Sequence, residues 1–332
     1  MSLAVFSSAA EWAARYGAAG RGSILAIGNF DGIHLGHQAI LRGVVARARA
    51  MGGVATVLTF EPPPLKILRP EQAPLRLSTN AQRLTWFAAG GLEAVVVLPF
   101  TKELAQLAPE EFVEEILVRG LHLRAVLVGE NFRFGHKQAG DVRLLRELGM
   151  RLGFEVTIVP PVSFRGELVS STVIRREIAA GNVSHAARLL GRPFVLTGAV
   201  VAGTGTGRKF TFPTLNLATE QELLPGEGVY ITQTKIGDVS YDSVSNIGNR
   251  PTFNGTALSV ETHLLGVSGE VHPERMKIRF WKRLRGEKKF SGAEELRAQI
   301  ARDIEQAGRF FARLKRFRGL RRTGNSVPAS KR

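Results

Sequence analysis

Short apolar runs alternate with segments of helical periodicity throughout residues 23–160, and this alternation constrains the fold more than any other feature of the sequence. The runs at 23–27, 54–60, 94–98, 125–128 and 156–159 have the length and composition of buried strands. Helical patterns lie between them at 38–50, 81–89, 110–118 and 142–152. Strands separated by helices form right-handed βαβ units, so the pattern predicts an α/β domain with a parallel sheet.

The loop after the first expected strand carries the strongest functional signal. Residues 28–36 contain several glycines, and His34 and His37 stand just before the expected helix. Backbone N–H groups and the dipole at a helix N-terminus attract anions, and imidazole N–H groups can stabilise charge developing on phosphorus. A phosphate-handling loop is predicted. A surface pair or half of a metal site is the alternative, although cysteine is absent and no carboxylate-rich partner lies nearby.

Further loops follow the other expected strands, where ligands of a parallel sheet bind. Phe60 is followed by Glu61 and three prolines at 62–64, a rigid turn that either walls a pocket or is a stiff loop without a ligand. Residues 129–135 combine Asn131 with aromatic neighbours, which suits a flat heterocycle.

A serine-rich segment precedes the helical pattern that runs to residue 180. Ser170 or Ser171 fits an N-cap, and the hydroxyl groups of this segment can donate to phosphate oxygens. Arg175 lies within the first turns, where a guanidinium can reach a leaving pyrophosphate. Simple helix capping is the alternative explanation of the segment.

The periodicity changes near residues 185–194. Strand-like runs then follow without intervening helices at 194–202, 228–235, 239–244, 259–265 and 276–281. This pattern predicts a small antiparallel barrel. An amphipathic helix over 293–314 is expected to cover it.

Three polar features stand out in this second half. The glycine-rich run 203–208 does not open a helix, so it is not a dinucleotide fingerprint; it is either a phosphate loop using Gly207 and Arg208 or a hairpin turn. Thr214 and Asn216 are two apart, so in an extended segment both point to one side and can share Mg²⁺. Glu261 lies in a β-like run and is either a general base or a structural hydrogen-bond acceptor.

The first half resembles the FMN adenylyltransferase module of prokaryotic bifunctional FAD synthetases, a nucleotidyltransferase with a Rossmann-like fold. The motifs are Gly28-Asn29-Phe30-Asp31-Gly32, His34-x-Gly36-His37, Gly129-Glu130-Asn131-Phe132-Arg133-Phe134-Gly135 and Ser170-Ser171-Thr172-x-Ile174-Arg175. The resemblance implies that His34 and His37 contact the ATP phosphates, with Arg175 and the 170–172 hydroxyls on the triphosphate side and Asn131 on the flavin side. Many members carry Pro-His-Pro where this chain has prolines at 62–64, so no histidine role carries over there.

The second half resembles the riboflavin kinase module of the same family. The motifs are Gly207-Arg208, Pro213-Thr214-x-Asn216, Gly228-Val229-Tyr230, Asn246-Ile247-Gly248-x-Arg250-Pro251-Thr252-Phe253 and Glu261-x-His263-Leu264. The resemblance places Thr214 and Asn216 at Mg²⁺ and the ATP phosphates, and makes Glu261 the base that activates the riboflavin 5′-hydroxyl. Residues 269–273 depart from the Leu-Tyr-Gly stretch that members often carry.

The predicted site is assembled from both halves. The catalytic set is Glu261, His34, His37 and Arg175. The ATP-binding set is Gly28, Asn29, Phe30, Asp31, Gly36, Ser170, Ser171, Thr172, Gly207, Arg208, Thr214 and Asn216. The flavin-binding set is Asn131, Phe60 and Arg250, and the Mg²⁺ ligands are Thr214 and Asn216.

Charge is concentrated at one end of the chain. Of the net +16, nine positive charges and no acidic residue lie in 309–332, which leaves +7 elsewhere and suits a protein that binds triphosphates and anionic flavins. The end itself is expected to be a solvated, partly disordered tail, with contact to RNA or membrane as the alternative. The start lacks the pattern of a signal peptide, and no apolar run reaches membrane-spanning length, so a cytoplasmic location is expected.

The resemblance of the two halves implies two consecutive transfers. An adenylyltransferase domain (1–186) converts FMN and ATP to FAD and pyrophosphate, and a kinase domain (187–316) makes FMN from riboflavin and ATP; a basic tail (317–332) follows. The partners are these small molecules, with no nucleic acid or membrane expected and self-association left open. The rivals are a single-activity adenylyltransferase with a degenerate barrel, and a non-enzymatic binding protein that acts through the tail.

Overall fold

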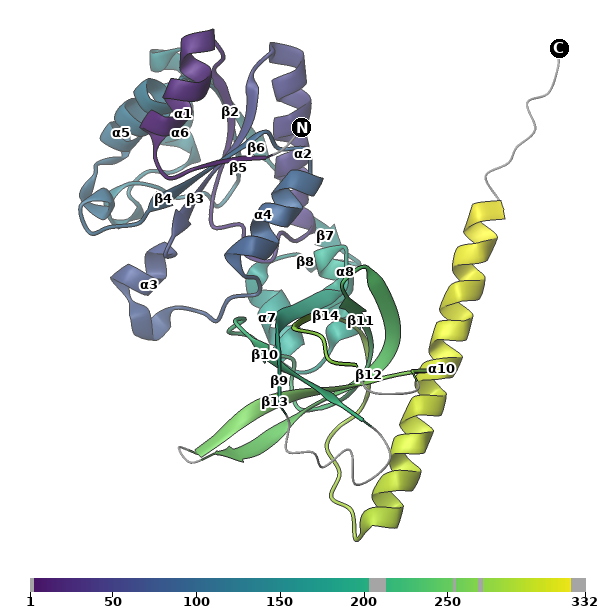
Figure 1. The fold of residues 1–332 in the computed structure, drawn as a ribbon. Helices are drawn as coiled ribbons and strands as arrows, with labels where there is room; N and C mark the ends of the chain where they lie inside the picture. The colour runs from purple at the N-terminus through teal and green to yellow at the C-terminus, as the bar shows by residue number, and fades with distance from the viewer. Residues whose placement is uncertain (1–2, 203–212, 253–254, 268–270, 324–332) are drawn as a thin grey trace, which may run out of the picture. The chain divides into compact units, whose positions relative to one another are not determined.

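A computed structural model describes residues 3–202, 213–252, 255–267 and 271–323 (Figure 1). The chain forms two compact units. The first comprises residues 1–174 and 189–191, and the second comprises residues 175–188 and 192–332. The domain boundary expected from the sequence, after residue 186, stays a prediction.

The first unit is built on a six-stranded parallel sheet in the order β1-β4-β3-β2-β5-β6. Its strands are β1 (Ala4–Phe6), β2 (Ser23–Ile27), β3 (Val54–Glu61), β4 (Ala94–Pro99), β5 (Leu123–Gly129) and β6 (Glu155–Val159). Its helices are α1 (Ala9–Tyr16), α2 (Leu35–Met51), α3 (Pro64–Leu68), α4 (Asn80–Ala89), α5 (Pro109–Glu111), the π-helical η4 (Phe112–Gly120) and α6 (Val142–Leu152). Short 3-10 turns are η1 (Gly17–Ala19), η2 (Pro70–Gln72), η3 (Leu104–Gln106) and η5 (His136–Gln138). The predicted Rossmann-like α/β fold is confirmed.

Both faces of this sheet are covered, which explains why its strands are apolar runs and not alternating ones. In β2, Ile24 and Ala26 pack into one buried cluster with Leu41 of α2 and Phe87 of α4. Leu25 and Ile27 point to the other face, where the cluster contains residues of α1, η4 and α6. Because successive side chains of a strand point to opposite faces, β2 contributes residues to two buried cores.

Two elements at the start of the first unit were not predicted from the sequence. β1 pairs with β4 at the edge of the sheet, and α1 follows it. Trp12 of α1 is fully buried and donates its indole N–H to Thr56 Oγ1 at 3.3 Å. A three-residue strand is too short to show a periodicity, so only the tertiary pairing defines it.

The second unit contains a closed antiparallel barrel in the order β10-β13-β12-β11-β14-β9, as predicted. Its strands are β9 (Phe194–Val201), β10 (Leu215–Thr219), β11 (Gly228–Ile236), β12 (Val239–Thr252), β13 (Gly255–Leu264) and β14 (Arg275–Arg285). Helix α10 (Ala293–Thr323) also belongs to this unit, whereas the hairpin β7 (Ser163–Phe164) and β8 (Glu167–Leu168) belongs to the first. Helices α7 (Ser171–Ala179) and α8 (Val183–Leu190) contain residues of both units. β10 was expected only as an extended segment.

The terminal helix α10 packs on the barrel through Ala307 and Phe311, which cluster with Ile231 of β11. Asp303 is buried and paired with Arg285 at 2.9 Å. The helix continues to Thr323, so residues 317–323, predicted as the start of a disordered tail, are helical. None of the helices in the described residues has the length and apolar character needed to cross a membrane.

Candidate functional site

The first site lies where the order of the parallel sheet reverses. From β2 the chain proceeds to β3 on one side, whereas β5 continues to β6 on the other. Ligands of open α/β sheets bind beyond the carboxyl ends of the strands at such a switch point. Gly28 directly follows β2, and Gly129 ends β5. A Cβ atom added at Gly129 would meet nothing within 4 Å, so there is open space beside this part of the main chain.

The two predicted histidines form one compact unit at the N-terminus of α2. His34 is the N-cap of the helix, and its Nδ1 accepts a hydrogen bond from the main-chain N–H of His37 at 3.3 Å. The two rings stack with centroids 3.7 Å apart and planes 18° apart. Because Nδ1 of His34 accepts, the proton of the neutral ring is on Nε2. The helix begins three residues earlier than the predicted 38, which places His37 in its first turn.

Gly36 is explained by the same geometry. A Cβ atom at this position would lie 3.2 Å from Cε1 and Nδ1 of His34, which is tighter than ordinary packing. The absence of a side chain at Gly36 therefore lets the His34 ring fold back over the helix start.

The other predicted residues of this loop mainly shape it. The ring of Phe30 is 2% exposed and packs edge-on against His37, with centroids 5.2 Å apart, so its side chain is part of the core under the loop. The Asp31 carboxylate accepts from the main-chain N–H groups of Leu77 and Ser78 at 3.0–3.1 Å, and from the Ser78 hydroxyl. Gly28 donates its N–H to the Leu58 carbonyl at 3.1 Å.

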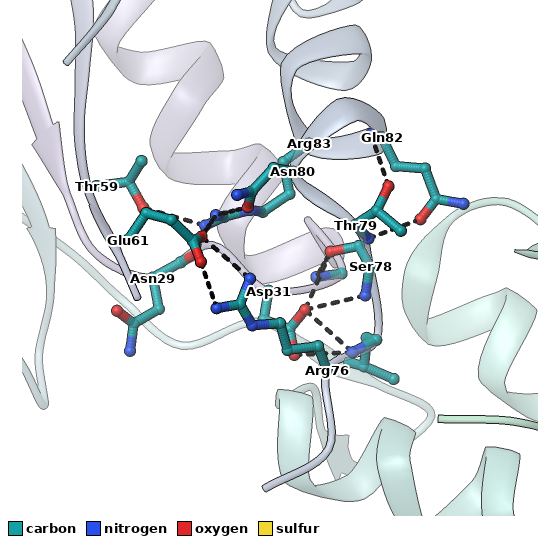
Figure 2. Close-up of polar contacts among 12 residues, drawn as sticks. Asn29, Asp31, Thr59, Glu61, Arg76, Ser78, Thr79, Asn80, Gln82 and Arg83 are labelled. Carbon is teal, nitrogen blue, oxygen red and sulfur yellow. Dashed lines mark hydrogen bonds and ion pairs between the residues drawn. The ribbon is translucent and has the colours of Figure 1, made fainter. Parts of the chain in front are cut away.

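An ion-pair network that the sequence did not predict braces this loop (Figure 2). Arg83 is 6% exposed and donates to the Asn29 carbonyl at 2.7 Å, to Thr59 Oγ1 at 3.1 Å and to Glu61 Oε2 at 3.1 Å. Arg76 binds Glu61 through both terminal nitrogens, at 2.6 and 3.0 Å. The sequence signal that could have indicated this network was Arg83 itself, a charged residue among the apolar positions of the helix predicted at 81–89.

The network sets the charge state of Glu61. Burial by itself raises the pKa of this carboxyl, but the hydrogen bonds from Arg76 and Asn80 and the positive charges of Arg76 and Arg83 outweigh it, so the pKa lies below its ordinary value. Burial lowers the pKa of Arg83, and the charge of Glu61 opposes that shift. Glu61 is therefore ionised throughout the neutral range.

This lowered pKa has a consequence for stability. A carboxyl with a depressed folded-state pKa stabilises the fold above its unfolded-state pKa of about 4.3, and the contribution is lost as pH falls through the folded-state pKa. We expect calorimetric unfolding of the full chain to show the Glu61→Gln variant less stable than the wild type at pH 7. The free energies of unfolding of the two proteins should become equal as the pH falls toward 3. A stability difference that stays constant over this pH range would contradict the prediction.

The predicted serine-rich segment connects α7 to the same loop. Ser170 Oγ accepts from the Val173 N–H at 3.3 Å and caps the helix, while Ser171 Oγ donates to the Asp31 carbonyl at 3.0 Å. Thr172 is exposed on the first turn of α7. Arg175 lies one turn further along α7 and groups with the second unit.

The predicted flavin-side residues also lie at carboxyl ends of strands. Asn131 is exposed in the turn after β5, which closes through a hydrogen bond from the Phe132 N–H to the Gly129 carbonyl at 3.1 Å. Phe60, the penultimate residue of strand β3, meets Phe100 edge-on with centroids 5.6 Å apart. Phe60 and Phe132 are half-buried at the border of the same apolar core. Phe60 and Phe132 thus supply apolar surface and Asn131 supplies an amide group, which are the contacts that a flat heterocycle requires.

The second site is a polar strip across three strands of the barrel. Asn216 of β10 and Asn246 of β12 are both direct cross-strand partners of Glu261 on β13. Directly opposed residues of antiparallel strands share a face, with Cβ atoms about 4.5–5.5 Å apart. Pro213 is tied to this strip because its carbonyl lies 2.9 Å from Nδ1 of His263, which holds Thr214 beside β13. Pairing thus brings together Thr214, Asn216 and Glu261.

Comparison with known proteins identifies the family. Residues 18–173 match the family model for FAD synthetase, and residues 190–311 match that for riboflavin kinase. The chain is 37% identical over 291 residues to the bifunctional riboflavin kinase/FMN adenylyltransferase of Escherichia coli K12, covering 87% of this chain and 93% of the relative. The chain belongs to the bifunctional riboflavin kinase/FMN adenylyltransferase family. The enzyme of the same name from Pseudomonas fluorescens is 39% identical over 289 residues, covering 86% and 92%.

A solved structure supports the fold of this bifunctional family member. The crystal structure titled as a macrolide-efflux protein from Streptococcus pneumoniae has a TM-score of 0.82 and 28% identity, covering 92% of this chain and 98% of that one. The predicted family, the two transferase domains and their order are confirmed.

Several predicted residues of this riboflavin kinase/FMN adenylyltransferase are not placed. Gly207 and Arg208 lie outside the described residues. Arg250 is in β12, and its side chain is not described. Within the described part of the chain, no group of three or more histidine and acidic side chains is arranged to hold a metal ion.

Asn246 was left out of the predicted site, although it opens the polar motif at 246–253. The face of β13 opposite to Glu261 is fixed by buried hydroxyls: Thr262 bonds Ser245 at 2.7 Å, and Ser245 bonds Thr232 at 2.8 Å. All three are fully buried. These bonds fix the register that brings Asn246 opposite Glu261.

Proposed function

We propose that the second unit phosphorylates riboflavin with ATP to give FMN and ADP, and that Glu261 is the general base. Its carboxylate takes the proton of the ribityl 5′-hydroxyl, and that oxygen attacks the γ-phosphate of ATP. The cross-strand pairing of Glu261 with Asn216 supports this role, because it places the base beside a residue suited to the phosphates.

Mg²⁺ fits the same strip. Hard oxygen ligands suit this ion, and the Thr214 hydroxyl and the amide oxygen of Asn216, a side chain that is 7% exposed, supply them beside the Glu261 carboxylate. When bound, the ion neutralises phosphate charge. Gly207 and Arg208 are proposed to bind the phosphates, and Arg250 the flavin.

We propose that the first unit joins FMN to the adenylyl group of a second ATP, releasing FAD and pyrophosphate. The FMN phosphate is already an anion, so the reaction needs no general base. The stacked histidine pair at the start of α2 is the observation that carries this assignment. The helix N-terminus and the imidazole N–H groups stabilise charge on the α-phosphate.

The remaining predicted residues have supporting roles in this proposal. Arg175 and the hydroxyls of 170–172 stabilise the leaving pyrophosphate, and Asn131 and Phe60 hold the flavin. Main-chain groups of 28–31 line the nucleotide. ATP as the substrate of both reactions favours a cytoplasmic enzyme.

One time course tests the overall proposal. Incubation of the full chain with riboflavin, ATP and Mg²⁺ should yield FMN first and FAD after a lag, resolved by chromatography. With FMN in place of riboflavin, FAD should form without the lag. Failure to convert riboflavin, together with intact conversion of FMN, would favour the single-activity rival with a degenerate barrel.

A further inference from the structure

Arg83 lies at a position of α4 where a positive charge destabilises the helix. α4 is N-capped by a capping box, in which Thr79 Oγ1 accepts from the Gln82 N–H at 3.2 Å and Gln82 Oε1 accepts from the Thr79 N–H at 3.0 Å. Arg83 follows directly, in the positively polarised first turn, where a cation is disfavoured. Its side chain is also buried, which opposes its charge. Another interaction must therefore account for a charged group here.

The contacts of Arg83 join the loop that follows β2 to the end of β3. Its guanidinium donates to the Asn29 carbonyl of the first loop, and to Thr59 and Glu61 at the end of β3 (Figure 2). It also donates to Asn80 on its own helix. A planar guanidinium can satisfy several acceptors at fixed angles, whereas a lysine ammonium is a compact point charge.

The loop that receives this contact is strained and needs external support. Phe30 and Ile33 have φ values of +47° and +38°, in the left-handed region that non-glycine residues rarely adopt. Such residues persist only where their surroundings fix them. The surroundings are Arg83 at the Asn29 carbonyl and Ser78, whose Oγ accepts from the Gly32 N–H at 3.0 Å.

A second contact from the same helix reaches the histidines. Phe87 lies one turn after Arg83 on α4 and meets Phe30 edge-on, with centroids 5.8 Å apart. Phe30 in turn meets His37 at 5.2 Å. One face of α4 therefore holds the loop by a polar contact at Asn29 and by an apolar contact that continues to His37.

We propose that Arg83 is a positioning residue for adenylyl transfer. It acts through the Asn29 carbonyl and the end of β3 to hold the 28–34 loop, and thereby the stacked His34 and His37 rings, in their reactive placement. This inference rests on the proposed role of the histidines. A displacement of reacting groups by about 1 Å can cost on the order of a hundredfold in rate.

Arg83→Lys tests the proposal, with Arg21→Lys as the matched control. Arg21 makes the same kind of bridge, to the Gly53 carbonyl at 2.9 Å and to Glu93 at 3.2 Å, but these residues precede β3 and β4 at the opposite edge of the sheet. We expect Arg83→Lys to lower kcat for FAD formation from FMN by about tenfold to a hundredfold, with KM for ATP changed much less. Arg21→Lys should leave kcat unchanged, and riboflavin phosphorylation should be unchanged in both.

Unchanged kcat in a folded Arg83→Lys protein would overturn the proposal, and so would a rise in KM for ATP alone, which indicates direct substrate contact. If Arg83→Lys unfolds the first unit, Phe87→Leu weakens the same loop through Phe30 and should lower kcat in the same way; an unchanged kcat there overturns the proposal.

A double-mutant comparison separates this inference from the proposed function. In a His37→Ala background, Arg83→Lys should lower kcat by a smaller factor than in the wild type, because one of the two rings that Arg83 holds is already gone. A factor as large as in the wild type would overturn the positioning role. If His37→Ala itself leaves FAD formation intact, the proposed function fails. If His37→Ala is inactive and Arg83→Lys is fully active, only the positioning role fails.

Discussion

His37→Ala should lower FAD formation from FMN by about a hundredfold to a thousandfold, the typical cost of removing one charge-stabilising donor. FMN formation from riboflavin should stay at the wild-type rate, because that reaction is assigned to the second unit. Both rates are measured on the same preparation of the full chain, with flavins separated by chromatography.

Matched variants distinguish the loss of the imidazole N–H donor from the loss of side-chain packing. His37→Phe keeps a ring against Phe30 and His34 but has no N–H donor, so it should be as inactive as His37→Ala. His122 precedes β5 at the amino edge of the sheet and has a φ of +45°, which asparagine tolerates. His122→Asn should therefore retain both activities. A loss of both activities by a folded His37→Ala protein would show that the two-site assignment is wrong.

Glu261→Gln should lower riboflavin phosphorylation by about a hundredfold to ten-thousandfold, the usual contribution of a general base. The amide has nearly the same shape as the carboxyl and keeps its place between Asn216 and Asn246, but it cannot take a proton. FAD formation from added FMN should be unaffected. Initial rates with riboflavin and with FMN as separate substrates measure the two effects.

The control for this variant is Glu274→Gln, an exposed glutamate just before β14 on the same barrel. It should retain full kinase activity. A Glu261→Gln protein that phosphorylates riboflavin at the wild-type rate would exclude the base role and leave Glu261 as a structural hydrogen-bond acceptor.

Much of the fold was predictable because its signals are local. A buried parallel strand such as β2 is apolar on both faces, and the change of periodicity near residue 190 marks the start of the barrel. The predictions failed where local signals were weak. β1 is three residues long, and the segment predicted as one helix at 110–118 divides into α5 and η4.

The sequence by itself determined the residue types of both sites, because glycine loops, histidines at a helix start and isolated polar residues in strands are visible in one dimension. Only the tertiary structure decided which of them meet. Register placed Asn246 opposite Glu261, and α4 brought Arg83 to the Asn29 carbonyl, 54 positions away in the chain. It also showed that the Phe30 ring and the Asp31 carboxylate support the loop, while their contact with ATP stays a prediction. Such contacts depend on strand pairing and on burial of charged groups, and both are set by the packing of distant segments.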